Sequence, residues 1–330
     1  MSPVSLIGMP TSPRHAHVEF SAPVLAEIEA RRQCFRHAGL ARRTVSCYES
    51  DWRTFRTWCA AAGRTALPAS PDTVELYVVD LIGRGRRIAT VSRHASAIQH
   101  FHRGAACPNP CGLEFHELLA GARRTLCEMP IRKDALSVRD LRRIVADIGN
   151  GTAIRARNGA LLLLGFATAL RRSSLSRLLA EDLSFEPQGV RIAIRHEKQD
   201  RKGEGRVVSV PYGKHAETCP VRALERWLGY RSDAPGPLFC HVLHGRIVFE
   251  RLRGNRICQI VQASVSAIGL DPKRYGCHSL RAGFVSEGME RGLDQFAIAR
   301  QTGHRSLRTL AVYMRSRNPL RGNACAAIGL

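Results

Sequence analysis

The most informative residues lie in the last third of the chain, where residues 278–281 read His-Ser-Leu-Arg, Gly303-His304 follows, and Tyr313 comes next. His278 and Arg281 are three residues apart, so they share one face if the segment is helical. The first N–H groups of such a helix also attract anions. A covalent attack on phosphate requires a nucleophile, cationic side chains and a nearby base. The pattern therefore predicts a phosphate-binding site with Tyr313 as its nucleophile.

The net charge indicates where that phosphate comes from. The chain has 50 Lys and Arg against 28 Asp and Glu, a formal net charge of +22. Residues 1–133 hold 18 Lys and Arg against 11 acidic residues, and residues 134–330 hold 32 against 17. Only five of the cations are lysine. An Arg-rich proteome explains that bias but not the shortage of acids, so a polyanionic partner, double-stranded DNA, is expected.

Three other classes of protein are not favoured. The longest apolar stretch, 159–170, is too short to cross a bilayer, so no membrane partner is expected. Residues 1–22 lack a secretory signal and are predicted to be a flexible arm. The odd number of cysteines, eleven, favours reduced thiols and a cytoplasmic location. Cys107 and Cys111 have three histidines nearby, but their spacing fits no common zinc finger, and no metal is expected.

Residues 23–125 are predicted to form a helical domain. Apolar side chains recur at helical spacing over residues 45–58, and such stripes are usually core. Ser70 and Pro71 mark the start of a second helix that continues to about residue 82. Further helices are expected over about 22–37, 90–102 and 115–124. The side chains predicted to contact DNA form a basic edge of this domain: Arg84, Arg86, Arg87, Arg93, Arg123 and Arg124.

Residues 126–134 are predicted to be a linker, and Ser137 begins the second domain as a helix cap. Alternating apolar residues predict two strands, 190–194 and 207–210, around a polar turn at 197–205. Lys198 and Lys202 belong to this turn, and each is a candidate for entering a DNA groove; most hairpin lysines are merely solvated. Helices are expected at about 220–230, 256–268 and 294–302, at the segment of His278 and Arg281, and from Ser306 through Tyr313.

Arg171 closes the buried helix of residues 152–170, where an unpaired charge is costly. Two partners would account for it. One is a ligand phosphate, and the other is a salt bridge to Glu181 or Asp182. The sequence leaves both open.

These residues resemble the tyrosine recombinase (phage integrase) family over about residues 24–318. The family's carboxy-terminal motif appears as HSLR, TGH and VYMR, and its upstream Thr-Gly-Leu-Arg corresponds to residues 168–171. The resemblance implies a SAM-like helical core-binding domain (23–125), an α+β catalytic domain (135–318) and a short tail (319–330). The expected fold is therefore mainly α, with a small antiparallel sheet in the second domain.

The resemblance also implies the chemistry. Tyr313 would form a 3′-phosphotyrosyl link, Arg171 and Arg281 would hold the phosphate, and Lys198, with Lys202 as its rival, would protonate the leaving oxygen. His278 would accept the tyrosine proton or organise the phosphate, and His304 would hydrogen-bond the transition state. No cofactor, ATP or divalent metal is implied. A homotetramer on two DNA sites, with accessory DNA-binding proteins in some systems, would work through a Holliday junction in a bacterial, phage-borne or plasmid-borne setting.

Two positions depart from the family pattern. Ala169 replaces the common glycine, a mild change if its backbone is helical. Ser174 stands where many members have an acidic residue that orients the first arginine, and Asp182 is a candidate to compensate.

The competing functions are a type IB topoisomerase, which uses a similar set of residues, and a non-catalytic DNA-binding protein. The short tail and the preceding helical domain favour a recombinase, and a mere binder has no need for Tyr313.

Overall fold

The computed structural model describes residues 21–40, 42–128, 132–195, 197, 200, 204–304, 306, 307 and 310. The chain separates into two compact units, Met1–Pro130 and Ile131–Leu330. Each unit has its own hydrophobic core. Most of the predicted arm and all of the predicted tail lie outside the described residues.

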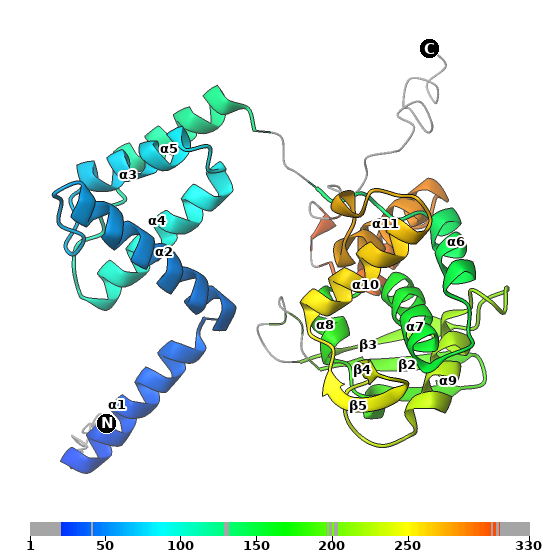
Figure 1. The fold of residues 1–330 in the computed structure, drawn as a ribbon. Helices are drawn as coiled ribbons and strands as arrows, with labels where there is room; N and C mark the ends of the chain where they lie inside the picture. The colour runs from blue at the N-terminus through cyan, green and yellow to red at the C-terminus, as the bar shows by residue number, and fades with distance from the viewer. Residues whose placement is uncertain are drawn as a thin grey trace, which may run out of the picture. The chain divides into compact units, whose positions relative to one another are not determined.

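The described part of the first unit is helical (Figure 1). Its helices are α1 (Ala22–Ala38), α2 (Arg42–Ala61), α3 (Pro71–Gly83), α4 (Ile88–Gly104) and α5 (Leu113–Leu126). The predicted apolar stripe lies on α2, where Phe55 is fully buried and Trp52 stacks on Phe101 with ring centroids 4.7 Å apart. Ser70 caps α3 as predicted, because its hydroxyl accepts a hydrogen bond from the Thr73 N–H.

The second unit is built around one buried helix, α7 (Ala153–Thr168). Its other α-helices are α6 (Val138–Ile148), α8 (Arg172–Arg177), α9 (Pro220–Arg231), α10 (Gly254–Ala267), α11 (Cys277–Glu290) and α12 (Gln295–Thr302), and two short 3-10 turns are η1 (Ala180–Asp182) and η2 (Pro272–Arg274). Leu161 to Leu164 of α7 are each at most 4% exposed, so this helix is buried on all sides. It packs against α6, α9 and α11, and Figure 1 shows α10 beside α11.

Two small antiparallel sheets complete the second unit. β1 (Leu183–Glu186), β2 (Gly189–Ile194) and β3 (Arg206–Pro211) form one sheet in that order, and β4 (Cys240–Leu243) pairs with β5 (Arg246–Arg251) in the other. β2 and β3 are the predicted strands, in a register that pairs Ile192 with Val208. The mainly helical fold with a small antiparallel sheet is thus confirmed.

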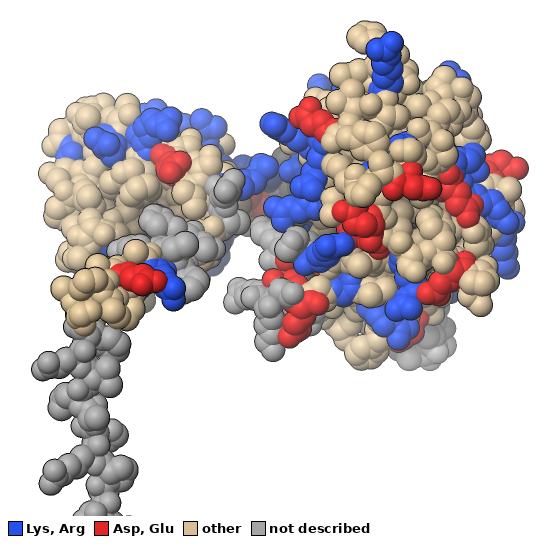
Figure 2. Space-filling view, turned by 90° about the horizontal axis from the view of Figure 1, so that it is seen from below, with Lys and Arg blue, Asp and Glu red and all other residues tan. Residues whose placement is uncertain are grey.

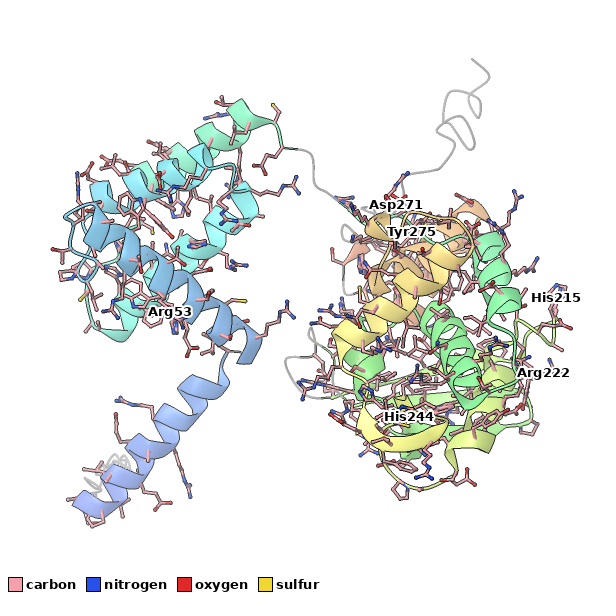
Figure 3. All side chains as sticks on the ribbon, in the orientation of Figure 1. Arg53, His215, Arg222, His244, Asp271 and Tyr275 are labelled. Carbon is pink, nitrogen blue, oxygen red and sulfur yellow. The ribbon has the colours of Figure 1, made fainter. Side chains whose placement is uncertain are left out.

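The β4–β5 hairpin was not predicted. Its strands are short, and its turn has no Asn-Gly or Asp-Gly pair. The turn residues are His244, labelled in Figure 3, and Gly245, with φ of +48° and +77°. Positive φ at both positions matches the two-residue turns that suit a twisted hairpin.

Helix α11 is fixed by close contact with the first residue of α6 and the chain just before it. The Leu136 N–H donates to the Ser279 carbonyl at 3.0 Å, and the Val138 N–H donates to Glu287 at 2.9 Å. A Cβ at Gly283 would lie 2.0 Å from the Leu136 carbonyl oxygen, so only glycine permits this approach. The position of α11 determines where its functional side chains lie.

Candidate active site

Helix α11 carries His278 and Arg281 in its first turns and begins two residues after Tyr275, which is labelled in Figure 3. The two side chains differ in exposure: His278 is exposed to solvent, whereas Arg281 is only 1% exposed. Their spacing of three residues places them on one face of the helix, as predicted. Partial desolvation, and then the positive charges of Arg281 and Arg171, lower the pKa of His278. Its imidazole is therefore neutral near pH 7 and able to accept a proton.

Arg281 connects three segments that are distant in sequence. Its Nη1 donates to the carbonyl oxygens of Ala169 at 2.7 Å and Thr302 at 2.5 Å. Its Nη2 lies 2.9 Å from Nε2 of His304. The end of α7, the start of α11 and the end of α12 therefore meet at one guanidinium group. A buried charge of this kind requires several hydrogen-bond partners.

The hydrogen bonds of His304 define its tautomer. Arginine only donates, so Nε2 of His304 accepts from Arg281. Nδ1 lies 2.6 Å from the Thr302 hydroxyl, and that hydroxyl lies 2.7 Å from the Ile298 carbonyl, to which it donates. Nδ1 of His304 therefore carries the proton. Burial, together with the charges of Arg281 and Arg171, lowers the pKa of His304 to about 4.

The neutral imidazole of His304 predicts a loss of stability in acid. The folded pKa of about 4 lies below the ordinary value of 6.5, so the unfolded chain binds more protons between these values. The contribution of His304 is present above pH 6.5 and is lost as the pH falls toward 4. We expect the free energy of unfolding to drop by about 1–2 kcal/mol from this group, after allowance for its partial exposure.

Urea denaturation at pH 7 and at pH 5 measures this drop. The His304→Gln protein lacks the titrating group and should lose less stability over the same interval. An equal loss in the two proteins would show that other groups, such as His278, account for the acid sensitivity.

Arg171 lies just beyond a sharp turn at the end of α7. Ala169 has φ +49° and ψ +29°, the left-handed conformation, and is fully buried. The condition for a mild replacement of glycine, a helical backbone in the usual right-handed region, is therefore not met. The left-handed conformation costs alanine about 1 kcal/mol relative to glycine. The turn brings Arg171 to the start of α8, where it is the N-cap residue.

The acidic partner of Arg171 differs from those considered in the sequence. Arg171 Nη1 lies 3.9 Å from Oε1 of Glu197, which follows β2. Asp182 instead accepts from Arg195 at 2.6 Å and from the Leu179 N–H at 2.9 Å. No role for Glu197 was predicted from the sequence. The one feature of the sequence that could have pointed to Glu197 is its place directly before Lys198.

Glu197 is also bound to a second arginine, Arg206 of β3, which sequence reasoning missed as well. Arg206 donates to Oε2 through Nε at 3.0 Å and to Oε1 through Nη2 at 3.3 Å. A cleft of about 230 Å³ lies here, and both residues line it together with Gly303 and His304. The cleft therefore lies between the facing ends of β2 and β3 and the loop after α12.

Three predicted site residues lie outside the described part of the chain: Lys198, Lys202 and Tyr313. Ile194 and Arg206, which are paired at the ends of β2 and β3, flank the segment that contains both lysines. The other four predicted residues, Arg171, His278, Arg281 and His304, are described. The charges of Arg171 and Arg281 act on both histidines, so these four are brought together.

The six arginines predicted to contact DNA lie at the end of α3, in the loop to α4, on α4 and in the last turn of α5. Three of them are held by carboxylates: Arg84 by Asp80, Arg87 by Glu128, and Arg93 by Asp51 in a two-pronged contact of 2.7 and 3.0 Å. Arg123 donates to the Ser92 hydroxyl, and Arg86, Arg123 and Arg124 are exposed. Figure 2 shows Lys and Arg side chains over the visible face of both units, with acidic residues among them.

No metal site is found among the residues that the structure describes. Cys111 is buried, and burial raises its pKa to about 11, which disfavours the thiolate that a metal requires. Over the same residues, no helix is both long enough and apolar enough to cross a membrane.

Comparisons with known proteins show which family the sequence matches. Residues 135–319 match the sequence model of the phage integrase family. An integrase/recombinase XerD homolog from Selenomonas ruminantium is 34% identical over 291 residues, which cover 86% of this chain and 84% of that protein. The tyrosine recombinase XerD of Bifidobacterium longum is 27% identical over 285 residues, covering 83% and 87%.

Solved structures share the fold at low sequence identity. The Tn1549 transposon integrase in complex with transposon right end DNA gives a TM-score of 0.62 at 14% identity, covering 91% of this chain and 98% of that one. A λ integrase tetramer bound to a Holliday junction gives a TM-score of 0.58 at 14% identity, covering 88% and 76%.

Proposed function

Because the chain belongs to the phage integrase family of tyrosine recombinases, which cut and rejoin DNA, we propose that it performs site-specific recombination through a covalent phosphotyrosyl intermediate. The observation that carries this proposal is the Arg281 junction. One buried guanidinium joins the Arg171 turn, helix α11 and the His304 loop. These segments supply two arginines and two neutral histidines at one place, which suits a phosphodiester and its developing charge.

In the proposed reaction, the phenolic oxygen of Tyr313 attacks the phosphorus of the scissile phosphodiester. A bond forms between phosphorus and the tyrosine oxygen, and the bond to the 5′ oxygen breaks. The 3′-phosphotyrosyl link keeps the energy of the broken bond. A 5′-hydroxyl of another strand therefore attacks the link, releases Tyr313 and rejoins the DNA without ATP. His278, neutral because its pKa is lowered, accepts the phenol proton.

Arg171 and Arg281 hold the non-bridging oxygens, since the guanidinium fork matches two phosphate oxygens. For His304 to donate to the same phosphate, Arg281 releases Nε2 and the imidazole changes tautomer: its proton moves from Nδ1 to Nε2, and the Thr302 hydroxyl turns to donate to Nδ1. Lys198 protonates the departing 5′ oxygen, with Lys202 as the alternative. Exposed arginines of the first unit, including Arg86 and Arg124, contact the DNA backbone.

The proposed assembly is a tetramer that holds two DNA sites and passes through a Holliday junction. The λ integrase structure, a tetramer on such a junction, supports this extension. The test uses a plasmid with two copies of the cognate site and a nicked DNA substrate that traps the covalent adduct. Recombinant products together with an adduct are expected. Relaxation of supercoils without strand exchange would favour the topoisomerase alternative, and binding without an adduct would favour a non-catalytic protein.

The leaving-group role of Lys198 predicts a chemical rescue. A sulfur in place of the 5′ oxygen leaves without protonation, so a 5′-phosphorothiolate should restore cleavage by Lys198→Ala to within about tenfold of the wild-type rate. The measurement is the single-turnover rate on oxygen-linked and sulfur-linked DNA.

Lys202→Ala is the matched control. It should change mainly the salt dependence of binding, because it removes one phosphate contact. Rescue by sulfur at Lys202→Ala in place of Lys198→Ala would assign the acid to Lys202.

A further inference from the structure

We propose that Glu197 is a positioning residue for the reaction: it orients Arg171 and couples that arginine to the loop that carries His304. The proposal rests on the function proposed above, because it gives Arg171 a phosphate to hold. It also answers a question that the sequence leaves open, namely which carboxylate serves Arg171 when position 174 is serine.

Glu197 is a buried charge with two cationic neighbours. Its side chain is 8% exposed, against 21% for Arg171 and 20% for Arg206. A buried carboxylate is stable only when it is paired and hydrogen-bonded. Arg206 satisfies this requirement with its two-pronged contact, and it thereby holds Glu197 in one orientation. The charge on Oε1 then faces Arg171 Nη1 at 3.9 Å.

Arg206 is itself anchored at the end of α12. Its Nη1 donates to the carbonyl oxygens of Arg300 at 3.3 Å and Gln301 at 3.1 Å. These are carbonyls of the last helical turn, where a positive charge is favoured. Glu197 is therefore tied to the helix whose next residues are Gly303 and His304.

Gly303 packs directly against this pair. It has φ +68°, and a Cβ there would lie 2.9 Å from both Arg206 Nε and Glu197 Oε2. The positive φ favours glycine, and a Cβ at this position would force the ion pair to shift. A displacement of Glu197 or Arg206 would therefore also displace the turn that carries His304.

Two routes therefore join Arg171 to His304. One runs from the Ala169 backbone carbonyl through the Arg281 guanidinium to His304. The other runs through side chains, from Arg171 to Glu197, Arg206 and the end of α12. Loss of Glu197 breaks the second route and leaves the first intact. Arg171 should then keep its place in the chain but lose the charge that directs its guanidinium.

The test compares Glu197→Gln with Glu186→Gln, measured as the single-turnover rate of cleavage. Glu186 forms an exposed pair with Arg191 at 3.3 Å on the same sheet, so it is a matched carboxylate that is not near Arg171. Glu197→Gln should slow cleavage by about 10-fold to 100-fold, by analogy with the partners that orient metal ligands. Glu186→Gln should cleave at the wild-type rate.

A double-mutant cycle separates positioning from support of the fold. If Glu197 acts through Arg171, adding Glu197→Gln to the Arg171→Ala protein should slow its cleavage further by less than about twofold, because the effects of residues that act as a unit are not additive. A methylphosphonate at the scissile position gives an independent readout. It removes the negative charge that Arg171 neutralises, so the penalties of Arg171→Ala and Glu197→Gln should shrink together.

The inference is overturned if Glu197→Gln cleaves at the wild-type rate, if its penalty multiplies in full with that of Arg171→Ala, or if methylphosphonate relieves Arg171→Ala alone. Failure of the proposed function looks different. In that case wild-type protein forms no adduct on its site, or Arg171→Ala cleaves as fast as the wild type.

Discussion

A Tyr313→Phe protein is expected to bind its DNA site with wild-type affinity and to form no covalent adduct. The substitution removes one oxygen, the atom that would bond to phosphorus, and leaves the ring and the basic surface unchanged. The covalent route then has no nucleophile, so the loss should be complete within detection. Denaturing gels with a nicked substrate measure the adduct, and a gel-shift titration measures the Kd.

Tyr275→Phe is the matched control for this experiment. Tyr275 lies two residues before α11, close to the same site, and its removal should leave adduct formation intact. A second tyrosine, Tyr77, is excluded as the nucleophile by its surroundings. Tyr77 is fully buried and its hydroxyl bonds His94, and burial together with the charge of Asp51 raises the pKa of its phenol. An adduct formed by Tyr313→Phe would contradict the assignment of the nucleophile.

The fold class was predictable because its signals are local. Apolar spacing marked α2, a continuous apolar run marked α7, a serine cap marked α3, and alternation marked β2 and β3. The β4–β5 hairpin was missed because His244-Gly245 is a weak turn signal for two short strands. Local patterns of this kind report periodicity and caps, so they identify elements better than they identify their partners.

The site was predictable to the extent that its residues belong to short motifs. His278 and Arg281 are one helical turn apart, and Gly303 precedes His304 directly. The contacts that organise these residues cross long stretches of chain. Arg281 reaches Ala169, and Arg206 reaches the carbonyls of α12, across 112 and about 95 positions. No periodicity reports such pairs, so Glu197 was not recognised as the carboxylate beside Arg171.

Arg281→Ala is expected to damage both the reaction and the fold. Arg281 is 1% exposed and donates to Ala169, Thr302 and His304. Its removal takes these donors from buried acceptors and leaves a cavity, which should lower the free energy of unfolding by about 2–4 kcal/mol. The phosphate also loses one of its two guanidinium groups, which should slow cleavage by about 10²-fold to 10³-fold or more.

Arg231→Ala separates the two effects, because Arg231 is a second buried arginine bound to carbonyls. It is also 1% exposed, and it donates to the carbonyl oxygens of Pro237, Ser232 and Ala234 beyond the end of α9. Its loss should lower the free energy of unfolding by a similar amount, whereas cleavage measured well below the melting temperature should stay within about threefold of wild type. Urea denaturation and single-turnover cleavage at the same temperature give the two quantities for each protein. Equal slowing of cleavage by both variants would mean that Arg281 acts through stability alone. A far larger slowing by Arg281→Ala would assign its guanidinium to the phosphate, because lost stability is then common to both proteins.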